Sequence, residues 1–180
     1  MRRDEFEHVI RAAADVVEDE IVVIGSQAIL EQHPDAPETL LTSLEVDVFP
    51  KNSPERADEI DGALGDGSRF HETYGYYAHG VDPETAIAPA GWEERLVPLV
   101  IPAILRSGAT VTAWCLEVND LVLAKLAACR PHDVEFAEEA IRARLVEVGR
   151  LRVGVDLMPE SHRELTRERL ESIIGRVDRR

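Results

Sequence analysis

The sequence predicts an α/β (α+β) protein with a mixed β-sheet flanked by helices and a helical C-terminal portion. Two observations predict this class. Short β-branched apolar runs alternate with amphipathic helical segments up to about residue 118, and only helical patterns follow. We therefore expect one compact domain in which residues 1–118 form the core sheet with its helices. Residues 119–180 are expected to form the helical portion that completes the functional site.

The first elements follow from the spacing of apolar residues. From Phe6 to Val17 apolar side chains recur at three- and four-residue intervals, which predicts an amphipathic helix. The continuously apolar run 21–24 predicts a buried strand that ends in a tight turn, followed by a helix over 27–32. Residues 44–49 alternate between apolar and acidic, which predicts a half-exposed strand closed by a proline.

The remaining elements are predicted from turn residues, caps and composition. Ser53 is the expected N-cap of a helix over 54–64, and Asn119 or Asp120 is the expected cap of a later helix. The expected elements are the helix 54–64, extended runs at 74–81, 95–100 and 110–116, and helices over 119–129, 133–148 and 161–174.

The charge distribution limits the partners. The chain has 20 basic and 35 acidic residues, a net charge of −15, which excludes a generally basic nucleic-acid coat. Residues 142–180 hold ten arginines against seven acids, so this tail is the one region expected to face an anion. Its acids and arginines also alternate at helical spacing, which is typical of a solvated helix face with ion pairs.

Neither export nor a membrane partner is expected. Cys115 and Cys129 are too few for a disulfide framework and are expected to be core thiols. The charged N-terminus lacks the apolar segment of a signal peptide. The most apolar stretch, 96–105, contains Pro98 and Pro102 and is too short to span a bilayer. We expect a cytoplasmic protein.

Glu45 and Asp47 form the first candidate site. Because they lie two residues apart on a predicted strand, both side chains belong to one face, with carboxylates about 7 Å apart. Such a pair can bind a hard cation such as Mg²⁺. The alternative is an ordinary solvated strand face.

A second candidate lies about twenty residues upstream. An apolar strand ends at Gly25-Ser26 and a helix follows, so backbone N–H groups and a hydroxyl can hold phosphate oxygens. A phosphate cradle together with a cation clamp supplies the parts needed for phosphoryl or nucleotidyl transfer.

Lys125 is the third candidate. It interrupts an apolar helix in a chain with only two lysines and eighteen arginines, and a compact ammonium suits a triphosphate. The alternative is a lysine that snorkels at the rim of the core. Asp133, at the start of the next helix, can cap that helix or accept a bond from Lys125 or Arg130.

Taken together, these segments resemble a known family. Gly25-Ser26, Ser43-x-Glu45-Val46-Asp47 and Lys125-x-x-Ala128-x-Arg130-x-x-Asp133 are similar to motifs of the minimal nucleotidyltransferase toxins of bacterial toxin–antitoxin systems. These are the MenT and AbiEii-like proteins of the DNA polymerase β-like superfamily. The resemblance implies a nucleotidyltransferase-type sheet and an NTP- and Mg²⁺-dependent enzyme. It also implies transfer of NMP, with pyrimidine preferred, to the 3′ end of tRNA, a block of aminoacylation and translation, and a cognate antitoxin.

The resemblance also implies roles for individual residues. Glu45 and Asp47 would hold the metal, and Asp47, Lys125 and Asp133 would be catalytic. The nucleotide would be bound by Gly25, Ser26, Ser43, Lys125 and Arg130. The chain departs from the family pattern because Glu45 stands where aspartate is usual and the third metal carboxylate has no clear match; Asp82 and Glu94 are the candidates.

Two other functions stay open from sequence. The acidic chemistry also suits a small cationic acceptor such as an aminoglycoside, and the fold can serve as a non-catalytic binding module. An RNA acceptor would require the arginine-rich tail to form a basic face beside the site. Thr39, Thr42 and Ser43 are either targets of an inactivating modification or residues that merely finish a loop.

Overall fold

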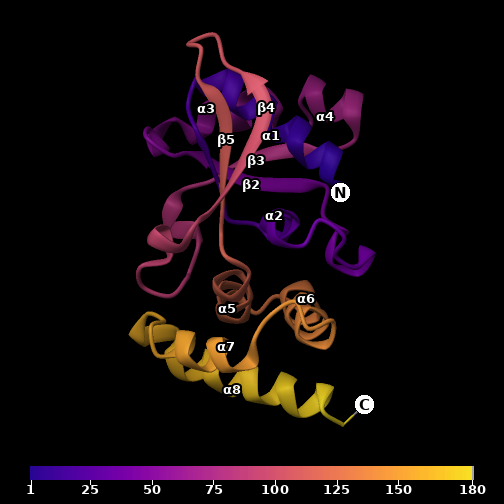
Figure 1. Cartoon of the computed structure of the whole chain (residues 1–180), viewed down its shortest axis with the longest axis vertical. Coiled ribbons are helices and arrows are strands. Elements are labelled where there is room, and N and C mark those ends of the chain that lie inside the picture. The colour runs from indigo at the N-terminus through magenta and orange to yellow at the C-terminus, as the bar shows by residue number, and fades with distance from the viewer. Residues whose placement is uncertain (180) are drawn as a thin grey trace.

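The computed structural model describes residues 1–179, and its centre is a mixed sheet of five strands in the order β3-β2-β1-β5-β4 (Figure 1). Strand β1 is antiparallel to β2 and parallel to β5, β3 is parallel to β2, and β4 forms an antiparallel hairpin with β5. The strands are β1 (Ile21–Val23), β2 (Glu45–Pro50), β3 (Tyr77–Gly80), β4 (Val97–Ile104) and β5 (Thr110–Cys115).

Within residues 1–179, eight α-helices surround or extend this sheet. They are α1 (Arg3–Val17), α2 (Ile29–Gln32), α3 (Ala57–Leu64), α4 (Arg69–Tyr74), α5 (Val118–Ala128), α6 (Pro131–Arg142), α7 (Val148–Val155) and α8 (Glu160–Val177). Helix α1 packs on the sheet through its apolar stripe, with Phe6, Val9 and Ile10 fully buried. Helix α3 lies close to β3 at Gly80, where a Cβ would collide with the Ala57 carbonyl oxygen.

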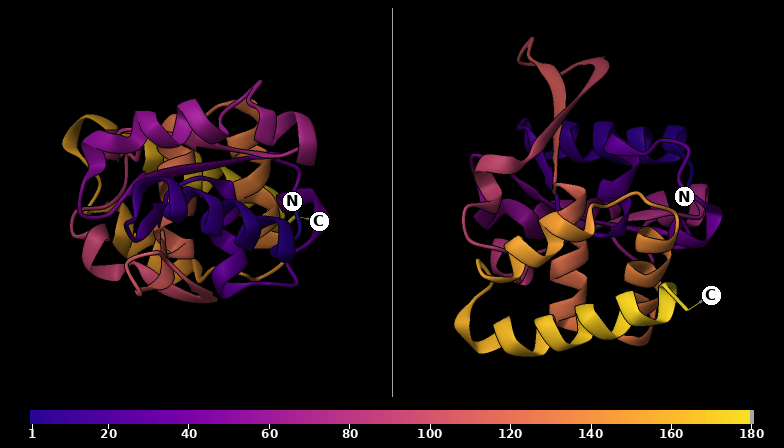
Figure 2. Two further views of the ribbon diagram at one scale, coloured as in Figure 1. Left: turned by 90° about the horizontal axis from the view of Figure 1, so that it is seen from above. Right: turned by 60° about the horizontal axis from the view of Figure 1, so that its bottom comes forward.

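Helices α5 to α8 form a layer of their own below the sheet (Figure 1). Helix α5 contacts α6, α7 and α8, and on its upper side it meets α2. Because neighbours surround it, α5 is apolar on nearly every side and Lys125 is an exception within it. The β4–β5 hairpin projects from the opposite end of the molecule, as the right-hand view of Figure 2 shows.

The predicted fold class is confirmed, and most elements lie where the apolar spacing placed them. Two helices were missed. Tyr74 ends α4 rather than starting a strand, because Gly75 takes a left-handed conformation (φ 79°) that closes the helix before β3. The predicted helix 133–148 ends at Arg142, since Arg144 has a φ of 56°, and the separate helix α7 follows.

The start of α5 also differs from the prediction. Its N-cap is Glu117, whose carboxylate accepts from the backbone N–H groups of Asn119 and Asp120. Asn119 instead accepts from the Glu147 N–H, and Asp120 pairs with Arg95 at 2.7 Å. Ser53 does occupy the N-cap of the turn that leads into α3, without a side-chain capping bond.

Cys115 is a buried core thiol, as expected, whereas Cys129 caps the end of α5 and is only partly buried; both are free. Within residues 1–179 no helix combines the length and apolar character needed to cross a membrane. The proposed division at residues 118 and 119 coincides with the start of α5 but stays a prediction.

Candidate active site

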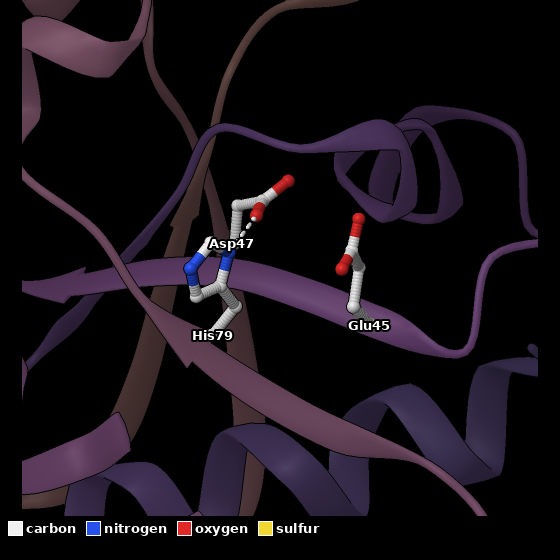
Figure 3. Close-up of side chains that lie close together, drawn as sticks. All are labelled: Glu45, Asp47 and His79. Carbon is white, nitrogen blue, oxygen red and sulfur yellow. Dashed lines mark hydrogen bonds and ion pairs between the residues drawn. The ribbon is translucent and has the colours of Figure 1, made fainter. Parts of the chain in front are cut away.

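Two neighbouring strands supply one wall of the site, here called the sheet wall: Glu45, Asp47, Tyr77 and His79. The parallel register pairs Glu45 with Tyr77 and Asp47 with His79. Because side chains alternate between faces and paired residues share a face, all four project from the same side of the sheet. Figure 3 shows the two carboxylates side by side on β2, with His79 reaching toward Asp47 from β3.

Each carboxylate has a partner on β3. The Tyr77 hydroxyl donates to Glu45 Oε2 at 2.9 Å. His79 Nδ1 lies 3.0 Å from Asp47 Oδ1. Burial and the bond to Glu45 raise the pKa of Tyr77 to about 12, so its hydroxyl keeps its proton at neutral pH and fixes the orientation of Glu45.

Asp47 occupies an environment that disfavours its charge. Burial raises the pKa of Asp47, the nearby Glu45 raises it further, and the bond from His79 and the charge of Lys125 offset this only in part. A Cβ at residue 25 would overlap the Asp47 carboxylate, so glycine is required for this close approach. A bound cation would relieve the unfavourable charge, and the donor atoms of Glu45, Asp47 and His79 all lie within 4.8 Å of one another. These residues therefore fit a divalent cation.

The opposite wall, here called the helix wall, consists of Lys125, Arg130 and Asp133. Lys125 Nζ donates to Asp133 Oδ1 at 2.9 Å, and Arg130 donates to Asp133 Oδ2 through both its backbone N–H and Nε at 3.1 Å. Asp133 is 1% exposed. Burial by itself would raise the pKa of Asp133, but the Lys125 and Arg130 donors lower it below its ordinary value. Both roles foreseen for Asp133, the helix cap and the lysine partner, are therefore observed.

A cavity of about 700 Å³ separates the two walls, and Ser26, Ser43, Glu45, Asp47, Lys125, Arg130 and Asp133 line it. An adjoining cavity of about 240 Å³ shares the central residues and adds Gly25 and His79. All the residues predicted to bind the metal or the nucleotide or to be catalytic thus line one of these two spaces, whereas Asp82 and Glu94, the candidates for a third metal carboxylate, line neither. The convergence of distant segments is observed, while the role of each residue stays a prediction.

The turn at Gly25-Ser26 is tighter than predicted. Ser26 begins a short 3₁₀ helix, η1 (Ser26–Ala28), and α2 adds a single further turn. Backbone N–H groups and the Ser26 hydroxyl, rather than a long helix dipole, are what this segment offers to a phosphate. Ser43 finishes the loop before β2, since its hydroxyl accepts from the Glu45 N–H and donates to the Glu45 carbonyl oxygen, both at 3.2 Å.

His79 and Tyr77 were missed by the sequence reasoning. Among the described residues, the group suited to a metal ion contains His79 in place of a third acid. Asp82 is used elsewhere, since its carboxylate caps a turn by accepting from the Glu84 N–H at 2.8 Å. Tyr77-Ala78-His79 does show the polar–apolar alternation of a half-exposed strand, but the register that brings it beside β2 is not visible in the sequence.

The outer part of the larger cavity is acidic. Glu135, Glu138 and Glu139 of α6 line it, and Arg142 there is paired with two of these acids. Other tail arginines are also paired with acids: Arg150, Arg152, Arg167 and Arg176. Of the tail arginines within residues 1–179, Arg142 is the one that lines this cavity; Arg180 lies outside the described residues. The described part of the tail therefore does not form the basic face beside the site that an RNA acceptor was expected to require.

Comparison with known proteins gives one match. No curated protein and no solved structure matches the chain. A family described as "nucleotidyltransferase of unknown function (DUF6036)" matches residues 3–170, which include both walls of the cavity. The chain therefore belongs to this nucleotidyltransferase family.

Proposed function

We propose that the protein transfers NMP from an NTP to a hydroxyl group of an acceptor. One observation carries this proposal: a carboxylate pair, a glycine–serine turn and a lysine, from three distant segments, line two adjoining cavities that have Glu45, Asp47 and Lys125 in common. Family membership supports the same reaction class.

Each residue has a distinct task in this reaction. Glu45 and Asp47 would hold the divalent cation, Mg²⁺ by the resemblance, which supplies charge neutralisation and polarisation of the phosphate. The Gly25-Ser26 turn would bind the β- and γ-phosphates through N–H groups and the Ser26 hydroxyl.

The bond between the acceptor oxygen and the α-phosphorus forms as the bond from the α-phosphorus to the bridging oxygen of the β-phosphate breaks. The acceptor hydroxyl gives its proton to solvent water, and pyrophosphate leaves. Lys125 would neutralise the charge that develops on pyrophosphate. Asp133 would act as a positioning residue, because it holds the Lys125 ammonium and the Arg130 side chain from behind.

For the acceptor we propose the 3′ end of tRNA, with the protein acting as a toxin held in check by a cognate antitoxin. Because Arg142 is the one described tail arginine at the cavity, Mg²⁺ and salt would have to screen the RNA phosphates in place of the tail. The resemblance of the motifs supports this assignment, which implies a cytoplasmic location. Thr39, Thr42 and Ser43 line the cavity. Phosphorylation there would add about two negative charges beside the cation site and would inhibit the enzyme.

The acid-lined outer cavity favours a second acceptor, a small cationic molecule such as an aminoglycoside. On this side Glu135, Glu138 and Glu139 outnumber Arg142, which pairs with two of them, so a net negative charge remains that would attract a polyamine and repel a nucleic-acid backbone. In both cases the NTP is the donor and the reaction is the same. The two proposals differ only in the acceptor molecule that occupies the α6 side of the cavity.

The test is transfer of label from each [α-³²P]NTP to total tRNA or to an aminoglycoside. We expect labelling that Asp47→Ala abolishes and that Asp58→Ala, an exposed acid on α3, leaves intact. Labelled tRNA would support the toxin, and a labelled aminoglycoside the alternative. If neither is labelled, but NTP raises the melting temperature in the presence of a divalent cation, the protein is a binding module instead.

A further inference from the structure

We propose that the Glu45–Asp47–His79 group selects Mn²⁺ over Mg²⁺. The inference concerns the same site as the proposed transfer reaction and rests on that proposal for the need for a cation. It starts from His79, whose place beside Asp47 is fixed by the β2–β3 register. The sheet wall therefore offers two carboxylates and one imidazole (Figure 3).

The spacing of these donors suits one ion. Two neighbouring ligands of an octahedral ion, with bonds of about 2.1 Å, lie about 3 Å apart. His79 Nδ1 and Asp47 Oδ1 are 3.0 Å apart, and one ligand atom from each of the three residues lies within 4.8 Å of the others. Ion binding would replace the hydrogen bond between His79 and Asp47, with the imidazole proton on Nε2. Since opposite ligands lie about 4.2 Å apart, a shift of less than about 1 Å brings the whole set onto a single ion.

The surroundings hold the donors in place. The Tyr77 hydroxyl fixes Glu45 from one side, and Gly25 leaves room for the Asp47 carboxylate on the other. Partners that orient metal ligands contribute strongly to metal affinity. Neighbouring residues thus position the ligands Glu45 and Asp47 on β2, and His79 on β3 completes the group.

The nitrogen donor decides which ion fits. Mg²⁺ takes oxygen ligands and depends on their negative charge, whereas imidazole suits first-row transition ions. A neutral imidazole contributes no anionic charge. Compared with a site of three carboxylates, this site should therefore lose more affinity for Mg²⁺ than for Mn²⁺. The two carboxylates and the phosphate oxygens of the NTP are hard ligands, which favours Mn²⁺ among the ions that accept nitrogen.

The test measures cation binding to the metal-free chain without nucleotide. Mn²⁺ binding is followed by the electron paramagnetic resonance signal of the free ion, and Mg²⁺ binding by competition. Carboxylate sites already favour Mn²⁺ to some degree. The decisive quantity is therefore the change in the Mn²⁺/Mg²⁺ affinity ratio between wild type and His79→Asp. We expect this ratio to fall by about tenfold or more in the variant.

His162→Asp on α8 is the matched control, since it makes the same replacement at a histidine outside the cavity lining, and the ratio should stay at the wild-type value. Pulsed electron paramagnetic resonance adds a direct readout: bound Mn²⁺ should show coupling to a ¹⁴N nucleus in wild type and lose it in His79→Asp. An equal ratio in both proteins, or no nitrogen coupling in wild type, would overturn the proposal. Because no NTP is present, a failed transfer assay leaves this result unaffected, and the reverse also holds.

Discussion

The two walls of the cavity shift the pKa of a carboxyl group in opposite directions. Asp47 and Asp133 each lie about 3 Å from a nitrogen of a basic side chain, yet the pKa of Asp47 is raised and that of Asp133 is lowered. Asp133 is the more buried of the two but has three donors from two permanent cations. Asp47 has one imidazole and a second carboxylate nearby. The donors, and not burial alone, decide the direction of each pKa shift. The helix wall therefore stabilises the fold, whereas the charge of Asp47 on the sheet wall is unfavourable and would be relieved by a bound cation.

The largest expected effect is that of Asp47→Asn. We expect transfer to fall about 1,000-fold or more, or about 4 kcal/mol, because a cation ligand is lost. The metal-free variant should nevertheless be more stable than wild type by about 0.5–2 kcal/mol, because a buried charge is removed. Urea unfolding in EDTA, alongside the transfer assay, measures both. A destabilised variant would contradict the proposed difference between the walls.

Lys125→Met should have the opposite effect on stability. It leaves Asp133 buried with one cationic side chain fewer, which should cost about 3 kcal/mol of unfolding free energy. Transfer should also fall at least about tenfold, or about 1.4 kcal/mol. The control is Lys51→Met, which removes the other lysine from a more exposed pair with Glu20 and should cost about 1 kcal/mol or less. If the two variants lose the same unfolding free energy, Lys125 is an ordinary lysine at the rim of the core.

The unfolding free energy should change with pH in opposite directions for the two walls: Asp133 should make it rise with pH, and Asp47 should make it fall. The lowered pKa of Asp133 contributes stability above the unfolded value of about 3.9, and this is lost as pH falls through the folded pKa. The raised pKa of Asp47 costs stability as pH rises from about 3.9 through its folded value. Unfolding free energies from pH 3 to pH 7 test this. The gain in Asp47→Asn should grow toward neutral pH, and the loss in Asp133→Asn should shrink toward pH 3.

The smallest expected effect is that of Tyr77→Phe. Loss of the hydrogen bond to Glu45 should weaken cation binding about fivefold, or about 1 kcal/mol, with little change in the fold. Calorimetric titration with Mn²⁺ is the measurement. An unchanged affinity would mean that Glu45 does not need Tyr77 to hold its orientation.

Local patterns predicted much of this site. Alternation placed Glu45 and Asp47 on one face, the apolar run ending at Gly25-Ser26 marked the turn, and an isolated lysine in an apolar helix marked Lys125. His79 could not be predicted as their neighbour, because strand pairing is a tertiary property with no local signal. Helix α4 was missed and Tyr74 was assigned to a strand, because the left-handed Gly75 that separates α4 from β3 has no signal in the apolar spacing. Helix α7 was missed because the apolar spacing continues past Arg142, whereas α6 ends there before Arg144, which has a positive φ.

The β4–β5 hairpin also affects the solubility of the protein. Strand β4 is an edge of the sheet, and Val100 and Ile104 on it are 64% and 75% exposed. An exposed apolar edge strand can pair through its free backbone groups with a strand of another chain. Pro98 and Pro102 have no N–H to donate, so the ladder that an incoming strand needs is interrupted twice. These prolines thus protect against edge-to-edge aggregation, and replacing both would be expected to make the protein prone to fibre formation.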